Sequence, residues 1–147
     1  MKLQEIYSNY RALYHVESRP EKIRKLQILR SEAEKHEYAG LPGLIDARIA
    51  GCEDRYGDSV NIIRSLLQSF PLDQELKAWA LINRGIIYAM KGETEKGIAD
   101  LIAVIDGPAA PADLKAEARF NRGVVYGQQG EPEKEIADYT AVMSRPA

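Results

Sequence analysis

The sequence has few of the His and Cys side chains that most often bind zinc or act as a catalytic base or nucleophile. The chain has two histidines, His15 and His36, which fall in separate predicted helices, and one cysteine, Cys52. A zinc site needs several ligands that converge on one point, and neither histidine has a Cys or Asp ligand pattern near it. The sequence also lacks a phosphate-binding glycine loop, a His-Glu-x-x-His motif and a nucleophile elbow. We therefore expect no catalytic residue, no metal site and no cofactor, and we expect that the protein is not an enzyme.

The composition is that of an ordinary soluble protein of one domain. The chain has 147 residues, of which 45% are hydrophobic and 29% are charged, with a net charge of -2. A general nucleic-acid binder would carry a surplus of basic residues. The chain has neither a run of apolar residues long enough to span a membrane nor the apolar core of a signal peptide. We expect a cytoplasmic protein that binds neither nucleic acid nor membrane.

The single cysteine excludes an intramolecular disulfide and is consistent with a reducing compartment. Cys52 lies in the apolar stretch LIDARIAGC. This setting favours a buried packing residue over a reactive thiol.

A segment that occurs twice is the most informative pattern in the sequence. Residues 76–109 (LKAWALINRGIIYAMKGETEKGIADLIAVIDGPA) and 114–147 (LKAEARFNRGVVYGQQGEPEKEIADYTAVMSRPA) are identical at 19 of 34 positions without a gap. Self-similarity at this period is typical of a solenoid, in which each unit buries its apolar face against its neighbours.

Apolar residues at helical spacing, interrupted by Gly and Pro, predict eight helices in four antiparallel pairs. We expect Asp58 and Asp73 to cap the fourth and fifth helices. No window shows the alternation of a strand. The predicted helices cover about 3–14, 20–38, 44–57, 58–70, 73–90, 94–105, 112–128 and 132–145.

The residue types shared by both copies predict how each pair packs. Gly85 and Gly123 lie in the middle of helices, where glycine costs about 1 kcal/mol relative to alanine. We therefore expect a close helix crossing at each glycine, with a tyrosine filling the space above it (Tyr88 and Tyr126). The small residues expected on the opposing helices are Ala99, Ala103, Ala137 and Ala141.

Each copy also repeats an arginine and an aspartate. We expect Arg84 to pair with Asp100, and Arg122 with Asp138, as ion pairs within their units. A ligand contact is the alternative role of the two arginines.

The pattern N-R-G-x-x-Y-x-x-x-G-x-x-x-x-x-I-x-D, followed by a proline ten residues after the isoleucine, resembles the tetratricopeptide repeat. The N-R-G-x-x-Y form with A-D-Y-T is similar to repeats common in bacterial members of that family. The matching residues are Gly85, Tyr88, Gly92, Ile98, Val104 and Pro108, then Gly123, Tyr126, Gly130, Ile136, Tyr139, Val142 and Pro146.

This resemblance implies an all-α right-handed superhelix, or solenoid, of about four antiparallel helix pairs within one domain, 1–147. Residues 76–109 and 114–147 are the clear repeats, 41–71 a degenerate repeat, and 1–38 an N-terminal helix pair. The chain departs from the family in that its copies start 38 residues apart rather than 34, and Gly97 and Glu135 stand where the family favours alanine. A buried Glu135 would be costly, so we expect the last helix to sit slightly open.

The resemblance further implies a concave groove lined by the first helix of each unit. The residues themselves indicate a second apolar face on helix 73–90, and a face of the same kind on helix 112–128. The amides of Asn83 and Asn121 either bind a peptide backbone or hydrogen-bond within the scaffold. The predicted partner-binding residues are Trp79, Ile82, Asn83, Ile86, Met90, Phe120, Asn121, Val124 and Gln128.

The predicted function is therefore a protein-interaction module that binds a peptide or helix of a partner. One alternative is a homodimer formed through the uncapped last helix, with Ile136 and Tyr139, or through a stripe of Tyr7, Tyr10 and Tyr14 near the N-terminus. Core packing is the other role predicted for that tyrosine stripe. A third possibility is the regulatory region of a larger protein.

Overall fold

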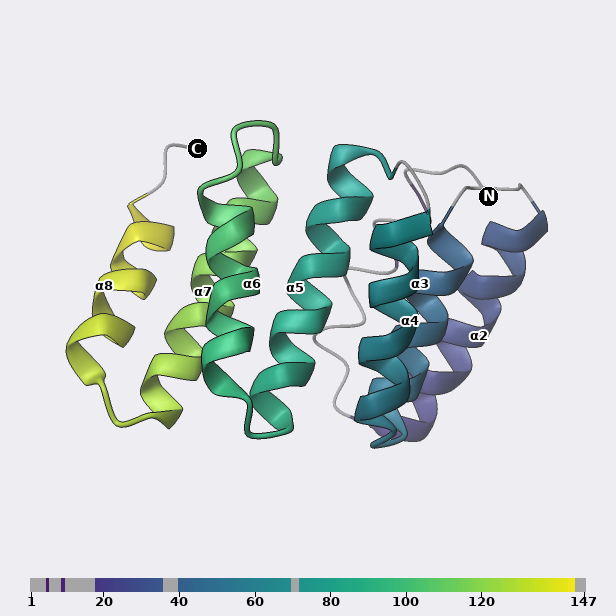
Figure 1. Cartoon of the computed structure of the whole chain (residues 1–147), viewed down its shortest axis with the longest axis horizontal. Helices are drawn as coiled ribbons and strands as arrows, with labels where there is room; N and C mark the ends of the chain where they lie inside the picture. Colours follow the sequence, from purple (N-terminus) through teal and green to yellow (C-terminus); the bar gives the residue numbers. More distant parts are fainter. Residues whose placement is uncertain (1–4, 6–8, 10–17, 36–39, 70–71, 145–147) are drawn as a thin grey trace. The chain divides into compact units, whose positions relative to one another are not determined.

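The described part of the chain is entirely helical. The computed structural model describes residues 5, 9, 18–35, 40–69 and 72–144, and among them it contains seven helices and no strand (Figure 1). The helices are α2 (Arg19–Lys35), α3 (Leu41–Cys52), α4 (Tyr56–Ser69), α5 (Gln74–Met90), α6 (Thr94–Ile105), α7 (Ala112–Gln128) and α8 (Pro132–Met143). The helix predicted over 3–14 lies outside the described residues except for Glu5 and Asn9, and so do Tyr7, Tyr10 and Tyr14.

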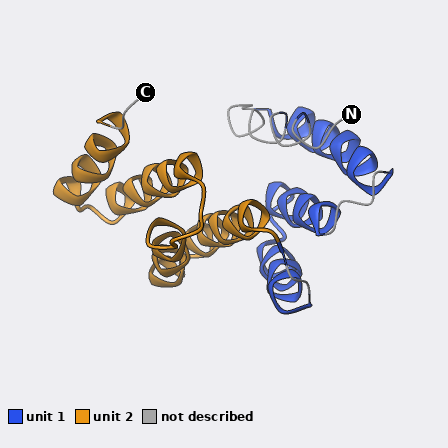
Figure 2. Cartoon of the chain, turned by 90° about the horizontal axis from the view of Figure 1, so that it is seen from above, with its two compact units in different colours: residues 1–72 blue, residues 73–147 orange. Residues whose placement is uncertain are grey.

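The chain divides into two compact units, residues 1–72 and residues 73–147 (Figure 2). In the first unit, α2 packs on α3 and α3 packs on α4. In the second unit, α5 packs on α6, α6 on α7 and α7 on α8, and α5 also contacts α7. The predicted all-α class is confirmed in the form of helices that pack in sequence order. Both clear copies of the repeat lie in the second unit.

The helix boundaries of the second unit follow the local signals in the sequence. The side chain of Asp73 accepts a hydrogen bond of 2.7 Å from the backbone N–H of Leu76, which confirms the predicted cap of α5. Gly92 and Gly130 follow the ends of α5 and α7, the first helix of each repeat. Their φ values of 87° and 76° are a conformation that favours glycine. Pro132 lies in the first turn of α8, where its missing N–H has no intrahelical partner to lose.

Three predicted boundaries in the first unit are wrong. Helix α3 ends at Cys52 rather than near Gly57. Helix α3 begins at Leu41 rather than near Leu44, because Pro42 is tolerated in the first turn of a helix. Asp58 does not cap α4, since the helix already begins at Tyr56. Its carboxylate instead accepts a hydrogen bond of 3.2 Å from Arg55.

The core of the first unit is apolar apart from one hydroxyl. Leu29 of α2 is buried and Ile28 is 56% exposed, so Leu29 rather than Ile28 faces the core. The Ser59 hydroxyl donates a hydrogen bond of 2.7 Å to the carbonyl of Ala47, which joins α4 to α3 and satisfies this buried hydroxyl. The buried apolar residues of this unit are Leu26, Leu29, Ala33, Leu41, Leu44, Ile45, Ala47, Ile49, Ala50, Val60, Ile63 and Leu66.

Helices α5 and α6 cross at backbone contact. A Cβ on Gly85 would lie 2.9 Å from the carbonyl oxygen of Gly97 and 3.1 Å from Cγ of Leu101. A Cβ on Gly97 would lie 2.5 Å from the carbonyl oxygen of Gly85. Neither position has room for a side chain, so the predicted close crossing at Gly85 is confirmed.

The prediction that alanines oppose these glycines is wrong. Gly97 and Leu101 face Gly85, and in the second copy Tyr139 faces Gly123. The alanines lie on another side of their helices, because two residues along a helix turn the side chain by about 200°. The exposed alanines are Ala99, Ala103, Ala137 and Ala141.

The crossing of α7 and α8 keeps the glycine but changes what it accommodates. A Cβ on Gly123 would lie 2.7 Å from the ring of Tyr139, so this glycine makes room for an aromatic ring. The Tyr139 hydroxyl donates a hydrogen bond of 3.1 Å to Glu135, and burial together with this bond raises the pKa of Tyr139 above its ordinary value.

Glu135 is accommodated by a second glycine. It stands where the first copy has Gly97, and it lies half-buried against Gly127, where a Cβ would overlap its carboxylate. The first copy has Ala89 in place of Gly127. The larger residue on α8 is therefore matched by a smaller residue on α7, and the Glu135 side chain is only half-buried.

The substitution Gly97→Ala should destabilise the protein by about 1–3 kcal/mol, because the added methyl group would collide with backbone rather than with a flexible side chain. This loss should outweigh the gain of about 1 kcal/mol in helix propensity. Urea unfolding of the full chain measures it.

Gly57→Ala is the matched control, since a Cβ on this helical glycine has nothing within 4 Å. It should stabilise the protein by about 0.5–1 kcal/mol. Equal stabilisation by both substitutions would contradict the backbone contact between α5 and α6.

Candidate functional site

Each helix pair of the second unit is joined by an ion pair with two hydrogen bonds. Nε and Nη2 of Arg84 donate to the two carboxylate oxygens of Asp100, at 2.7 and 2.8 Å. Arg122 and Asp138 repeat this geometry at 2.9 and 2.6 Å. Asp100 and Asp138 are only 8% and 5% exposed, so the predicted structural ion pairs are confirmed. Nε and Nη2 of each arginine are therefore used within its own unit.

The same arginines lie beside the repeated tyrosines. The Arg84 guanidinium is 5.7 Å from the ring centroid of Tyr88, and the ammonium of Lys96 is 5.6 Å from that centroid. Hydrogen bonds to Asp100 raise the pKa of Arg84 above its already high ordinary value, so the cation persists at any working pH. The Tyr88 ring therefore has two cations of its own unit within 6 Å of its centroid.

The second copy has the same arrangement. Arg122 and Lys134 lie 5.7 and 5.3 Å from the ring centroid of Tyr126. Hydrogen bonds to Asp138 likewise raise the pKa of Arg122. The arginine and tyrosine of N-R-G-x-x-Y therefore form the same cluster in both copies, together with an aspartate and a lysine of the following helix.

The predicted partner-binding face is buried along the first half of α5. Trp79 and Ile82 are 0% exposed, and Asn83 is 4% exposed. A partner cannot reach these three side chains in this structure. The second apolar face of α5 is therefore covered where the sequence analysis expected a partner to lie.

The remaining part of that face is accessible. Met90, at the end of α5, is 51% exposed, and Phe120 on α7 is 49% exposed. Ile86 and Val124, at equivalent positions of the two copies, are half-buried. Since α5 contacts α7, these apolar side chains come from neighbouring helices of one unit.

The two polar residues of this face on α7, Asn121 and Gln128, differ in hydrogen bonding and exposure. The Asn121 amide donates a hydrogen bond of 2.8 Å to the carbonyl of Glu117, one turn earlier in α7. This donor is therefore used within the helix, which is the scaffold role weighed from the sequence. Gln128, at the last position of α7, is exposed.

Helix α8 exposes apolar residues whose counterparts in α6 are covered. Ile136 is 62% and Met143 is 84% exposed. Their counterparts 38 positions earlier are Ile98, which is half-buried, and Ile105, which is 8% exposed. Helix α7 packs on α6, whereas no helix follows α8 in the part of the chain that the structure describes.

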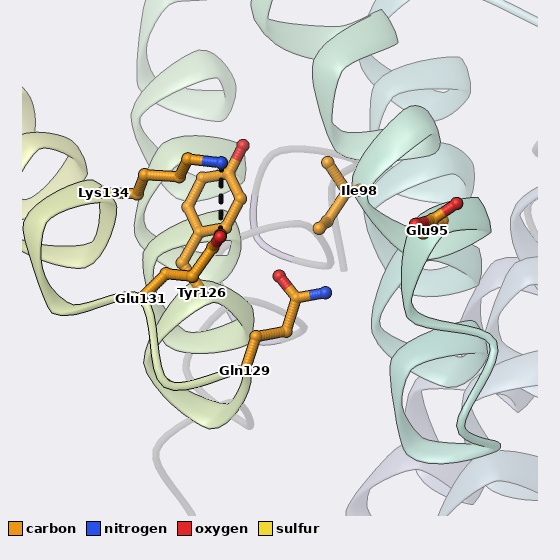
Figure 3. Close-up of a pocket in the computed structure, with 6 residues that line it drawn as sticks. All are labelled: Glu95, Ile98, Tyr126, Gln129, Glu131 and Lys134. Carbon is orange, nitrogen blue, oxygen red and sulfur yellow. Dashed lines mark ion pairs between the residues drawn. The ribbon is translucent and has the colours of Figure 1, made fainter.

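A cleft that was not predicted lies between α6 and the corner that joins α7 to α8. The cleft has a volume of about 380 Å³, within the range of about 300–1,000 Å³ that is usual for small-ligand sites. A signal in the sequence existed, because the two copies differ in charge at one corner position, Lys91 against Gln129. The lining residues are Glu95, Ile98, Tyr126, Gln129, Glu131 and Lys134 (Figure 3).

The residues considered for chemistry precede the second unit in the sequence. Cys52, the last residue of α3, is half-buried. His15 and His36 lie outside the described residues. Among the residues that the structure describes, no group of three or more His, Cys, Asp or Glu could hold a metal ion.

Comparisons with known proteins identify no relative. No family model, no curated protein and no solved structure matches the chain. The resemblance to tetratricopeptide repeats therefore rests on the repeated residues alone. Within the described residues, no helix is long and apolar enough to cross a membrane.

The burial of Trp79 can be tested directly, because it is the only tryptophan of the chain. The fluorescence of the folded protein should be blue-shifted and should resist quenching by iodide, since the indole has no exposed surface. Urea should restore quenching to the level of free tryptophan. Strong quenching of the folded protein would place Trp79 on an open surface, as the sequence analysis expected.

Proposed function

We propose that this protein is a non-enzymatic, cytoplasmic interaction module of the tetratricopeptide-like class. Its second unit would bind an apolar segment of a partner protein on the accessible part of the face made by α5 and α7. The observation that carries this proposal is the exposure of Met90 and Phe120 beside half-buried Ile86 and Val124. Large apolar side chains gathered at a surface mark interaction sites more often than scattered ones do.

The architecture of the second unit supports the repeat class. Two helix pairs carry the same glycine crossing and the same arginine–aspartate pair, and α7 contacts both helices of the preceding pair. In a repeat protein each unit is stabilised by its neighbours, and the surfaces where the copies differ are free to vary.

The surface chemistry favours a partner segment with one apolar side. Four apolar side chains lie in two rows, one on α5 and one on α7, and the exposed amide of Gln128 lies at the end of the α7 row. An amphipathic helix or an extended peptide can place apolar anchors along such rows. The exposed amide can pair with the polar groups of the partner's backbone.

The test compares a Met90→Asp/Phe120→Asp variant with the wild-type chain. Both residues are about half exposed, so the variant should fold, and circular dichroism checks this. Affinity for a partner captured by the wild-type chain should fall at least about tenfold, as expected when apolar anchors are lost.

The control is Ala103→Asp/Ala137→Asp, which adds the same two negative charges at exposed residues of α6 and α8 outside the face. It should leave the affinity unchanged. Equal affinity of the wild-type chain and the double variant would overturn the proposed binding face.

Self-assembly through α8 is the second candidate function. It is favoured by Ile136 and Met143, which are open on α8 although the equivalent residues of α6 are covered or half-buried. The mass of each protein in solution, measured in the same experiment, separates the two functions. A dimer that Ile136→Lys dissociates would support self-assembly, and a monomer at all concentrations would exclude it.

A further inference from the structure

The cleft beside Tyr126 is assigned no role by the proposed function. Glu95 and Ile98 of α6 form one side of it, and Tyr126, Glu131 and Lys134 form the other, with Gln129 between them (Figure 3). All six residues belong to the second unit.

The lining of the cleft carries an excess of negative charge. Glu131 and Lys134 form an ion pair of 3.2 Å, so one of the two carboxylates is partly compensated. The Glu95 side chain lies on α6 as an exposed carboxylate and makes no ion pair or hydrogen bond with any described residue. Two carboxylates and one ammonium leave a net charge of one negative unit, which favours a cation as the ligand.

The first copy of the repeat shows how the chain itself supplies a further cation at this corner. Glu93, the counterpart of Glu131, lies 3.6 Å from Lys91 and 3.5 Å from Lys96. The counterpart of Lys91 is Gln129, so the second copy has lost one of these two positive charges. Glu93 therefore has a lysine at the position where Glu131 has only the uncharged amide of Gln129.

We propose that this cleft binds an arginine side chain of a partner protein. A guanidinium has donors spread in a plane, so it can reach acceptors on separate walls, here the carboxylates of Glu95 and Glu131 and the amide oxygen of Gln129. Its aliphatic stem would lie against Ile98, which is the apolar residue of the opposite wall. Tyr126 acts as a wall rather than as the cation site, because Arg122 and Lys134 already lie near its ring.

The arginine site and the α5–α7 face are separate surfaces. Tyr126 follows Val124 by two residues, which places their side chains about 200° apart around α7. The inference rests on the proposed function only in that the arginine belongs to a partner protein. Each surface can therefore be tested while the other stays intact.

The experiment titrates the isotope-labelled full chain with N-acetyl-arginine amide and records NMR signals of the Ile98 methyl group and the Gln129 side-chain amide. We expect both signals to shift, with a dissociation constant of about 1 mM for a single exposed side chain. The neutral analogue N-acetyl-citrulline amide should cause no shift. Raising the ionic strength from about 0.01 to about 0.15 M, which shortens the Debye length from about 30 to about 8 Å, should weaken the binding.

Two variants and one matched control assign the binding to this cleft. Gln129→Lys restores the cation of the first copy and should weaken arginine binding at least about fivefold, and Glu95→Gln should weaken it about twofold to fivefold. Glu133→Gln removes the same charge from an exposed residue of α8 that does not line the cleft, so it should have no effect. All three positions are exposed or at a helix end, and thermal unfolding checks that each variant folds.

Equal shifts with citrulline, or unchanged arginine binding by both Gln129→Lys and Glu95→Gln, would overturn the proposal. Such a failure would leave the α5–α7 face untouched, because the probe carries no apolar anchor for Met90 or Phe120. Conversely, if Met90→Asp/Phe120→Asp left partner binding unchanged, the NMR signals of Ile98 and Gln129 should still shift with arginine.

Discussion

The second unit depends on an arginine–aspartate pair that joins the two helices of each repeat. Both pairs have the same separation of 16 residues and use Nε and Nη2 of the arginine. Because a guanidinium is planar and its donors are fixed, two hydrogen bonds to a buried carboxylate admit essentially one register between the helices. A buried ion pair contributes little net stability compared with apolar packing, so its main contribution here is to specify that register.

The register then positions the other contacts. With Arg84 held on Asp100, Gly85 lies against Gly97 at backbone contact, and the Tyr88 ring lies beside the same guanidinium. The second pair keeps this order while replacing Gly97 by Glu135. The ion pair and the glycine of the crossing are therefore constant between the copies, whereas the residues that face this glycine and several surface residues differ.

Those surface differences are where binding can be specific. Gln129 stands at the corner between α7 and α8, where the first copy has Lys91. The cleft that Gln129 lines beside α6 therefore has a net negative charge. On the last helix, Ile136 is open because no described helix follows it. Both features follow from a comparison of the two copies. Helix α7 packs on α6 whereas no described helix follows α8, and Gln129 lacks the charge of Lys91.

Much of the second unit could be predicted from the sequence, because its signals are local. Asp73, Gly92, Gly130 and Pro132 act on the backbone within a few residues, and the predicted spans of α6 and α7 match the structure. The arginine–aspartate pairs were also predictable, since each copy repeats both partners at the same spacing.

The features that could not be predicted from the sequence required knowledge of what covers a surface. Helical periodicity places Trp79 and Ile82 on one face of α5, but it does not say that this face is buried. The expected role of Ala99 at the crossing was wrong for a related reason, because small size alone does not give the phase of a helix against its neighbour. The cleft around Gln129 brings together residues of α6, α7 and the α7–α8 corner, and its shape depends on tertiary packing.

The most direct test of this account is a double-mutant cycle on each pair, Arg84→Gln with Asp100→Asn and Arg122→Gln with Asp138→Asn, measured by urea unfolding. The account predicts a coupling energy of about 1–3 kcal/mol in both cycles, as expected for charged hydrogen bonds with little solvent exposure. Coupling near zero in both cycles would contradict the claim that these pairs set the register of the helices.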